Sequence, residues 1–159
     1  MTLTTSNGFF QDKVVIPFKN QLKQGVTPKQ LALTCAVGSV LGIFPLLGVT
    51  TFFCILLGLV WKLNQPILQA VNYLLYPVQL LLLPTFVLMG EKLTGSEPVS
   101  FNPSTVVKEF MADPRIFLGH YGMAGFHAVM VWAVVAPFLA WVVYQLSLRI
   151  FLKLRVNSV

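Results

Sequence analysis

The chain has 159 residues, of which 56% are hydrophobic and only 10% are charged. Soluble domains carry about 25% charged residues, so this composition excludes an ordinary soluble protein, while the length fits one small domain. The net charge of +6 does not indicate nucleic-acid binding, because the basic residues flank the apolar part of the chain and lack interleaved aromatic residues.

Three stretches of the chain contain no Asp, Glu, Lys or Arg, namely residues 31–61, 63–90 and 116–148. A helix needs about 20 apolar residues to cross the hydrocarbon core of a bilayer. Each stretch is longer than that. The sequence therefore predicts an all-α integral membrane protein with transmembrane helices.

Residues 1–26 are predicted to form a cytoplasmic tail with an interfacial amphipathic helix. In residues 9–24, apolar residues recur every four positions, at Phe10, Val14, Phe18 and Leu22. Lysines lie between them in the sequence. Such a helix lies on anionic lipid, although Pro17 is expected to bend or split it. The segment has no apolar stretch ending at a cleavage site, so we expect no cleaved signal peptide.

Residues 27–95 are predicted to form the membrane core. Thr27 can cap a helix, Pro28 suits its first position and Gln30 would complete a capping box. Gly38 and Gly42 form a Gly-x-x-x-Gly step, which favours close approach of a neighbouring helix.

The centre of the first apolar stretch should interrupt its helix, because Pro45 and Gly48 are poor helix residues. Each half then holds about 14–16 residues, or roughly 21–24 Å, which is short for a crossing. We therefore expect a re-entrant hairpin with its tip at Pro45 and Gly48, where Thr50 and Thr51 would bond unpaired backbone groups. The alternative is a single kinked helix.

The second apolar stretch opens at Asn64-Gln65-Pro66, another predicted helix start, and carries a polar stripe. Its members are spaced by four, three, four and three residues and share one helix face: Gln65, Gln69, Asn72, Tyr76 and Gln79. Side-chain amides facing lipid would be costly, so the stripe should face other helices or a water-filled path. Hydrogen bonding between helices and a substrate-facing lining both remain open.

Together the tip and the stripe make the candidate binding site, which consists of Pro45, Gly48, Thr50, Thr51, Asn64, Gln69, Asn72, Tyr76 and Gln79.

Residues 96–115 should form a polar loop with a short amphipathic helix that starts at Asn102-Pro103 and ends at Asp113-Pro114, which should also cap the helix that follows. Residues 116–159 should form a C-terminal transmembrane helix and a basic cytoplasmic tail, with Trp141 and Tyr144 as an aromatic belt.

Basic residues near the ends of apolar spans favour the cytoplasmic side. They precede the first span and follow the last, so we expect a multi-pass protein with both termini and Lys62 in the cytoplasm and residues 91–115 on the far side. A swapped arrangement, with the second stretch re-entrant, stays open.

The chain shows no constellation for catalysis, a metal or a cofactor. His120 and His127 share a helix face and could relay protons or bind a metal, but no carboxylate stands near them in sequence. Cys35 and Cys54 have no metal-binding spacing. We therefore predict no enzyme, although catalysis by the carboxylates of residues 91–115 is a further hypothesis.

The first two stretches resemble a family of bacterial membrane proteins known as domain of unknown function 2062. The resemblance covers roughly residues 20–95. It rests on the Leu-Lys-Gln-Gly-Val-Thr-Pro-Lys-Gln-Leu-Ala segment from residue 22, the Pro-x-x-Gly centre at Pro45 and the Asn-x-Pro start at Asn64. Where the family often has Asn-Pro, this chain has Tyr76-Pro77. The resemblance implies a bacterial inner-membrane protein and supplies no activity.

The leading hypothesis is a non-enzymatic protein that binds or moves a lipid or a small molecule at the hairpin and the stripe, without a cofactor. Its expected partners are the lipid bilayer and further copies of itself, and not nucleic acid. The alternative is an accessory or scaffolding subunit whose stripe serves only packing or oligomerisation.

Overall fold

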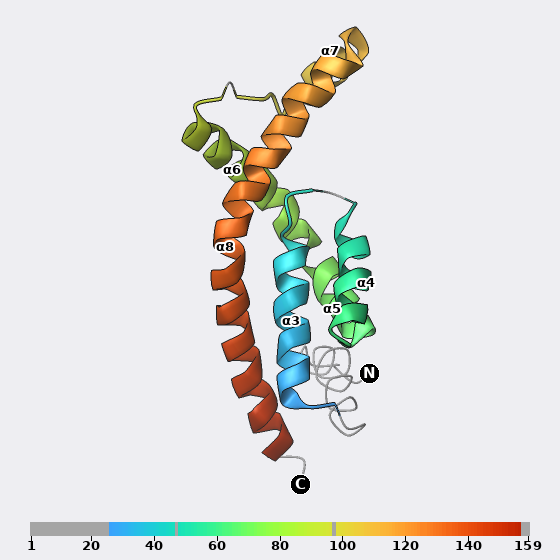
Figure 1. The fold of residues 1–159 in the computed structure, drawn as a ribbon, viewed down its shortest axis with the longest axis vertical. Coiled ribbons are helices and arrows are strands. Elements are labelled where there is room, and N and C mark those ends of the chain that lie inside the picture. Colours follow the sequence, from blue (N-terminus) through green and yellow to red (C-terminus); the bar gives the residue numbers. More distant parts are fainter. Residues whose placement is uncertain (1–25, 47, 97, 157–159) are drawn as a thin grey trace, which may run out of the picture.

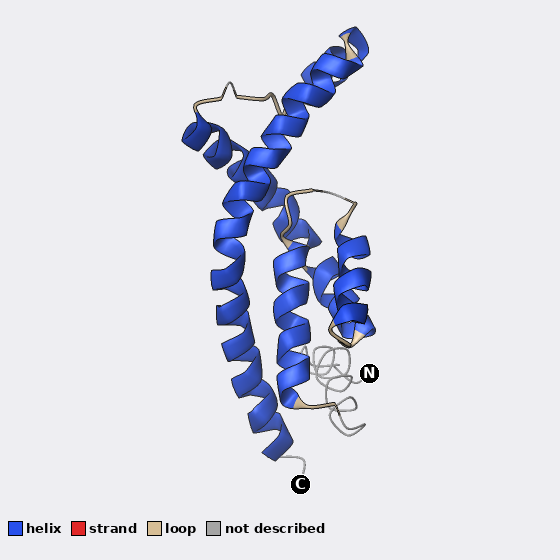
Figure 2. Cartoon of the chain, viewed as in Figure 1, coloured by secondary structure: helices blue, strands red, loops and turns tan. Residues whose placement is uncertain are grey.

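The computed structural model describes residues 26–46, 48–96 and 98–156, and the predicted interfacial helix lies outside them. Within these residues the fold is all-helical, with six helices and no strands (Figures 1 and 2). The helices are α3 (Pro28–Gly42), α4 (Thr50–Val60), α5 (Gln65–Leu74), α6 (Tyr76–Thr94), α7 (Pro103–Ala112) and α8 (Pro114–Val156).

Helices α3 and α4 form a hairpin from the first apolar stretch, so the predicted interruption is confirmed. The side-chain oxygen of Thr27 accepts from the backbone N–H of Gln30 at 3.2 Å, which caps α3 as expected. Gln30 does not return the bond as a capping box would; its amide donates to the carbonyl of Lys62 at 2.8 Å. Gly48 adopts a φ of +85° in the turn before α4, a conformation that favours glycine.

Helices α5 and α6 come from the second apolar stretch and meet at a bend of 57°. Asn64 caps α5, since its side-chain oxygen accepts from the N–H of Ile67 at 3.2 Å. The bend falls at Leu75, just before Pro77. This is expected, because proline lacks a backbone N–H and clashes with the preceding helical turn. The polar stripe is therefore divided between two helices, and the prediction of one continuous helix face was wrong.

Helices α7 and α8 begin where the sequence predicted them to begin. Asn102 caps α7 through a bond from the N–H of Ser104, and Asp113 accepts from the N–H groups of Arg115 and Ile116 at the start of α8. Helix α8 has 43 residues and continues through Pro137. At 1.5 Å per residue its length is about 65 Å.

The hairpin packs against α8 on one side and α5 on the other, while α6 crosses the upper half of α8 (Figure 1). A Cβ added to Gly38 would lie 3.0 Å from Val71, and one added to Gly42 would lie 2.9 Å from Leu75. The Gly-x-x-x-Gly step therefore allows the close approach of α3 to the α5–α6 junction, as predicted.

Among the described residues, one helix segment, Pro114–Leu154, is by itself long and apolar enough to cross a membrane. The bent pair Gln65–Leu74 and Tyr76–Thr94 would make a second span if it counts as one. The first apolar stretch is divided into helices of 15 and 11 residues. The first apolar stretch is thus long enough in sequence to cross a membrane, but neither of its two helices is.

Candidate functional site

The tip of the hairpin is held by side chains from two other helices. Gln79 of α6 donates its amide to the carbonyl of Phe44 at 2.6 Å, in a buried hydrogen bond. The indole N–H of Trp132, on α8, donates to the carbonyl of Val40 at 3.1 Å. The rings of Phe44 and Trp132 also meet edge to face, with centroids 4.8 Å apart. Carbonyls left free by the end of α3 are therefore satisfied inside the protein, as burial requires.

The sequence assigned this bonding role to Thr50 and Thr51, which lie at the start of α4, whereas these two carbonyls accept from Gln79 and Trp132. Thr50 is buried at the start of α4. The hydroxyl of Thr51 lies 3.5 Å from that of Tyr73, at the outer limit of a hydrogen bond. Trp132 was not among the predicted site residues, and no local signal in the sequence pairs it with a carbonyl 92 positions earlier.

Asn64 lies at the base of the hairpin and not at its tip. The turn that contains it is bonded to α3 twice: the amide of Gln30 donates to the carbonyl of Lys62, and the N–H of Asn64 donates to the hydroxyl of Thr34 at 3.4 Å. Gln65 donates to the carbonyl of Ile55 at 3.1 Å. The structure therefore does not bring Asn64 together with the tip residues.

The middle of the stripe contains the two stripe members with unpaired oxygens. Asn72 is 3% exposed, and its side-chain oxygen has no hydrogen-bond partner among the described residues. The side-chain oxygen of Gln69 is likewise buried and unpaired within that part of the chain. Tyr76, by contrast, is 44% exposed. The stripe thus divides into Gln65 and Gln79, which donate to backbone carbonyls, two amides with spare acceptors, and an exposed phenol.

An apolar groove lies between α3, α4 and α8, below the hairpin tip. Its volume is about 470 Å³, and it is lined only by apolar and aromatic side chains, among them Leu33, Val40, Trp61, Trp132, Trp141 and Tyr144. Cavities of about 300–1,000 Å³ suit small-molecule and cofactor-sized ligands. The surface that these side chains present to the groove is apolar, which favours a hydrocarbon ligand over a polar solute.

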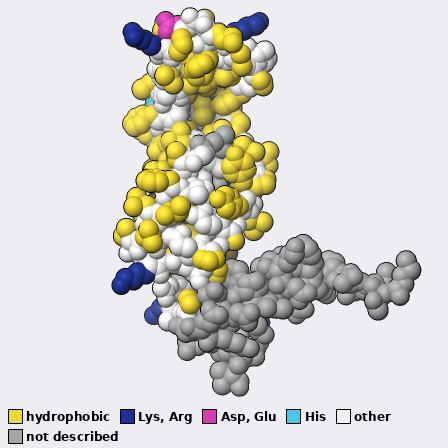
Figure 3. Space-filling view, turned by 90° about the vertical axis from the view of Figure 1, so that its right-hand side faces the viewer, with side chains coloured by type: hydrophobic (Ala, Val, Ile, Leu, Met, Phe, Trp, Pro, Cys, Tyr) yellow, Lys and Arg dark blue, Asp and Glu magenta, His cyan; other side chains and the backbone are white. Residues whose placement is uncertain are grey.

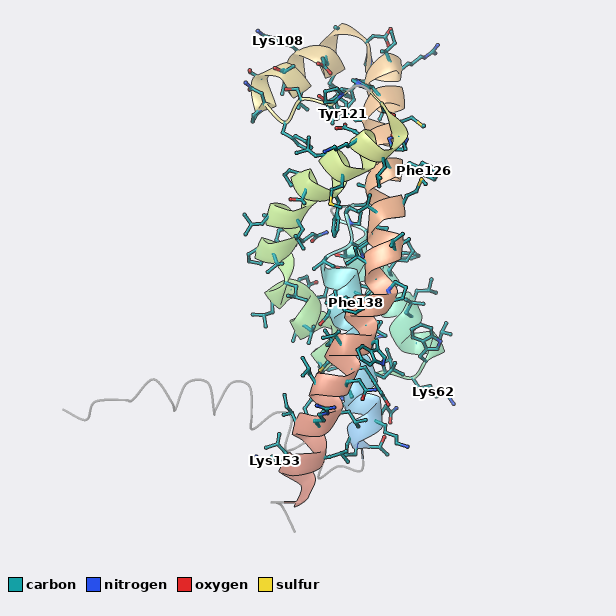
Figure 4. The ribbon with its side chains drawn as sticks, turned by 90° about the vertical axis from the view of Figure 1, so that its left-hand side faces the viewer. Lys62, Lys108, Tyr121, Phe126, Phe138 and Lys153 are labelled. Atoms are coloured by element: carbon teal, nitrogen blue, oxygen red, sulfur yellow. The ribbon has the colours of Figure 1, made fainter. Side chains whose placement is uncertain are left out.

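The flanks of the molecule are apolar and its charges gather at the ends (Figure 3). Several large hydrophobic side chains on α5, α6 and α8 are each at least 69% exposed, among them Leu74, Leu81, Leu93, Val134 and Phe138. Lys62 and Lys153 lie toward one end and Lys108 at the other (Figure 4). Soluble monomers rarely expose so large an apolar surface.

A second cavity has a volume of about 380 Å³ and lies between the end of α6, the segment that follows α6, and α8. This part of the molecule is at the opposite end from the C-terminus (Figure 1). It is lined by Glu91, His120 and His127 among others. No carboxylate stands near the two histidines in the sequence, because Glu91 comes to line the same cavity only where α6 crosses α8 at Gly90. In the part of the chain that the structure describes, no group of three or more His, Cys, Asp or Glu residues could hold a metal ion.

A family model described as "Uncharacterized protein conserved in bacteria (DUF2062)" matches residues 18–158. The match extends beyond residues 20–95, where the sequence resemblance was found, and includes α7 and α8. No curated protein and no solved structure matches the chain.

Proposed function

The chain belongs to the bacterial DUF2062 family, and on that premise we propose that it is an integral inner-membrane protein that binds a lipid acyl chain in the apolar groove. It does so without catalysing a reaction. Helix α8 and the bent pair α5–α6 each cross the bilayer, and the α3–α4 hairpin enters from the basic end and returns to it. One candidate span, Pro114–Leu154, and the apolar flanks support this arrangement.

The groove is the observation on which the proposal rests. It opens on the apolar flank that lipid would surround, and the surface inside it is apolar. Trp61 and Trp141 stand toward the basic end, where aromatic side chains favour the headgroup level of a bilayer. An acyl chain in the groove would lie against α3 with its headgroup near these rings.

The hairpin tip would lie near the middle of the membrane in this arrangement. Phe44, which precedes Pro45 at the tip, contacts Trp132, close to the midpoint of the Pro114–Leu154 segment. Non-helical backbone at that depth is tolerated only when it is buried in protein or lines a wet cavity. The bonds from Gln79 and Trp132 to the tip carbonyls meet this condition.

A photoreactive phospholipid with a diazirine in its acyl chain tests the proposal in reconstituted vesicles. Mass spectrometry should find the label concentrated at Val40 and Trp132, which line the groove toward the hairpin tip, and weaker at Leu81, which is exposed on α6 outside the groove. A140W fills the groove and should reduce this labelling strongly, while L81W should not. Uniform labelling of all exposed positions, unchanged in A140W, would mean that the label comes from ordinary surrounding lipid and that the groove holds no bound acyl chain.

A scaffolding role is the second candidate, and the bonds of the stripe favour it. Gln65 and Gln79 both donate to carbonyls of the same chain, so at these positions the stripe already serves packing. If A140W dissociated an oligomer in detergent and left lipid labelling unchanged, the groove would be a subunit interface.

A further inference from the structure

The cavity at Glu91 is independent of the lipid groove and lies at the other end of the molecule. We propose that it binds a primary ammonium group, with the unpaired oxygen of Glu91 as the main acceptor.

Glu91 is buried, at 3% exposure, and its two carboxylate oxygens differ. Oε1 accepts from the backbone N–H of Val99 at 2.9 Å. Oε2 is buried and has no hydrogen-bond partner among the described residues. A buried carboxylate is costly unless it is paired or fully hydrogen-bonded. The spare oxygen therefore needs a donor that this part of the chain does not supply.

The other polar side chains that line the cavity are two imidazoles and a hydroxyl. His127 is buried, and its Nδ1 lies 3.4 Å from the hydroxyl of Thr94. His120 and Ser96 also line the cavity, and its lining includes no lysine or arginine. Such a surface favours a cation that donates several hydrogen bonds.

The size and composition of the cavity favour an organic ammonium over a metal ion. Its volume of about 380 Å³ is that of a small-molecule site, and the described residues hold no metal-binding group of three or more ligands. Apolar side chains, including Val99 and Met123, share the lining with Glu91. A short carbon chain that ends in –NH₃⁺ fits this mixture, whether it is a lipid headgroup amine or a free amine.

The methyl group of Met123 offers a probe inside the cavity. The full chain, labelled with ¹³C in its methionine methyl groups and held in a neutral detergent, is titrated with ethanolamine, and M123L assigns the signal. The Met123 signal should shift with ethanolamine. It should not shift with choline, whose quaternary ammonium has no N–H donor, or with the uncharged ethylene glycol.

Two variants tie the shift to the site. E91Q keeps an acceptor for Val99 but removes the charge, and it should weaken ethanolamine binding at least about tenfold, since charge-assisted hydrogen bonds are roughly twice as strong as neutral ones. S96F fills the cavity without touching the carboxylate and should block binding. E109Q, which changes an exposed carboxylate on α7, should bind as the wild type does.

Nanodiscs distinguish the two sources of the amine. If the Met123 signal differs between phosphatidylethanolamine and phosphatidylcholine discs, the headgroup occupies the cavity; if it is the same in both, the free amine is the ligand. The proposal is overturned if ethanolamine leaves the signal in place, if choline shifts it equally, or if E91Q binds as the wild type does. In those cases the cavity holds only water.

Discussion

At the scale of single residues, two buried amides of the stripe have opposite surroundings. Gln79 donates to the carbonyl of Phe44, whereas the side-chain oxygen of Asn72 has no partner within the described residues. A side-chain amide in the same sequence pattern therefore stabilises the fold at Gln79 and leaves an acceptor unsatisfied at Asn72. Spacing alone could not separate them, because the partner of Gln79 lies 35 positions away.

Q79M should destabilise the protein by about 1–2 kcal/mol, because it leaves a buried carbonyl without a donor. N72L removes an acceptor that has no partner, so its free energy of unfolding should stay within about 0.5 kcal/mol of the wild type or rise. Reversible unfolding in mixed micelles measures both. Equal losses in the two variants would contradict the assignment of Gln79 as the support of the tip.

At the scale of helices, the starts of helices were the most predictable features. Thr27-Pro28, Asn64-Gln65-Pro66 and Asn102-Pro103 each begin a helix where expected, because a cap and a proline act within one turn. The crossing of α6 and α8 could not be predicted in this way. It depends on the bend at Leu75 and on the close approach at Gly90, and it alone brings Glu91 beside His127.

The α6–α8 crossing should depend on Gly90. An alanine Cβ there would lie 2.7 Å from backbone and side-chain atoms of His127, so G90A should cost about 1–3 kcal/mol of stability by forcing the helices apart. Gly122 of α8 has no neighbour within 4 Å of an added Cβ, and G122A should be neutral or stabilising by up to about 1 kcal/mol, since alanine favours helix. Thermal unfolding in detergent compares them. A G90A variant as stable as G122A would rule out tight packing at this crossing.

At the scale of the whole molecule, the charges suggest which end faces the cytoplasm. The hairpin base and the C-terminal lysine lie toward one end, and residues 91–115, which carry four of the five acidic residues, lie at the other (Figure 4). The expected orientation with both termini in the cytoplasm stays a prediction.

Single cysteines in a background without Cys35 and Cys54 test this orientation in intact cells with a membrane-impermeant maleimide. A cysteine at Ser100 should react from outside, and one at Lys62 should react only after the inner membrane is opened. A cysteine at Leu46, which is exposed at the tip without the left-handed backbone of Gly48, should be protected in both cases by lipid. Labelling of position 62 from outside would mean that the first apolar stretch crosses the membrane completely.

The bond between Trp132 and Val40 also has a consequence for how the protein is made. The partners lie 92 residues apart, and at about 5–20 residues per second the ribosome needs roughly 5–20 s to supply the indole after the carbonyl. During that interval the base of the hairpin can already close, because Gln30 and Lys62 are synthesised early. The tip has no α8 to dock on during that time, so in the proposed membrane arrangement an unfinished hairpin has to be sheltered for several seconds in every newly made chain.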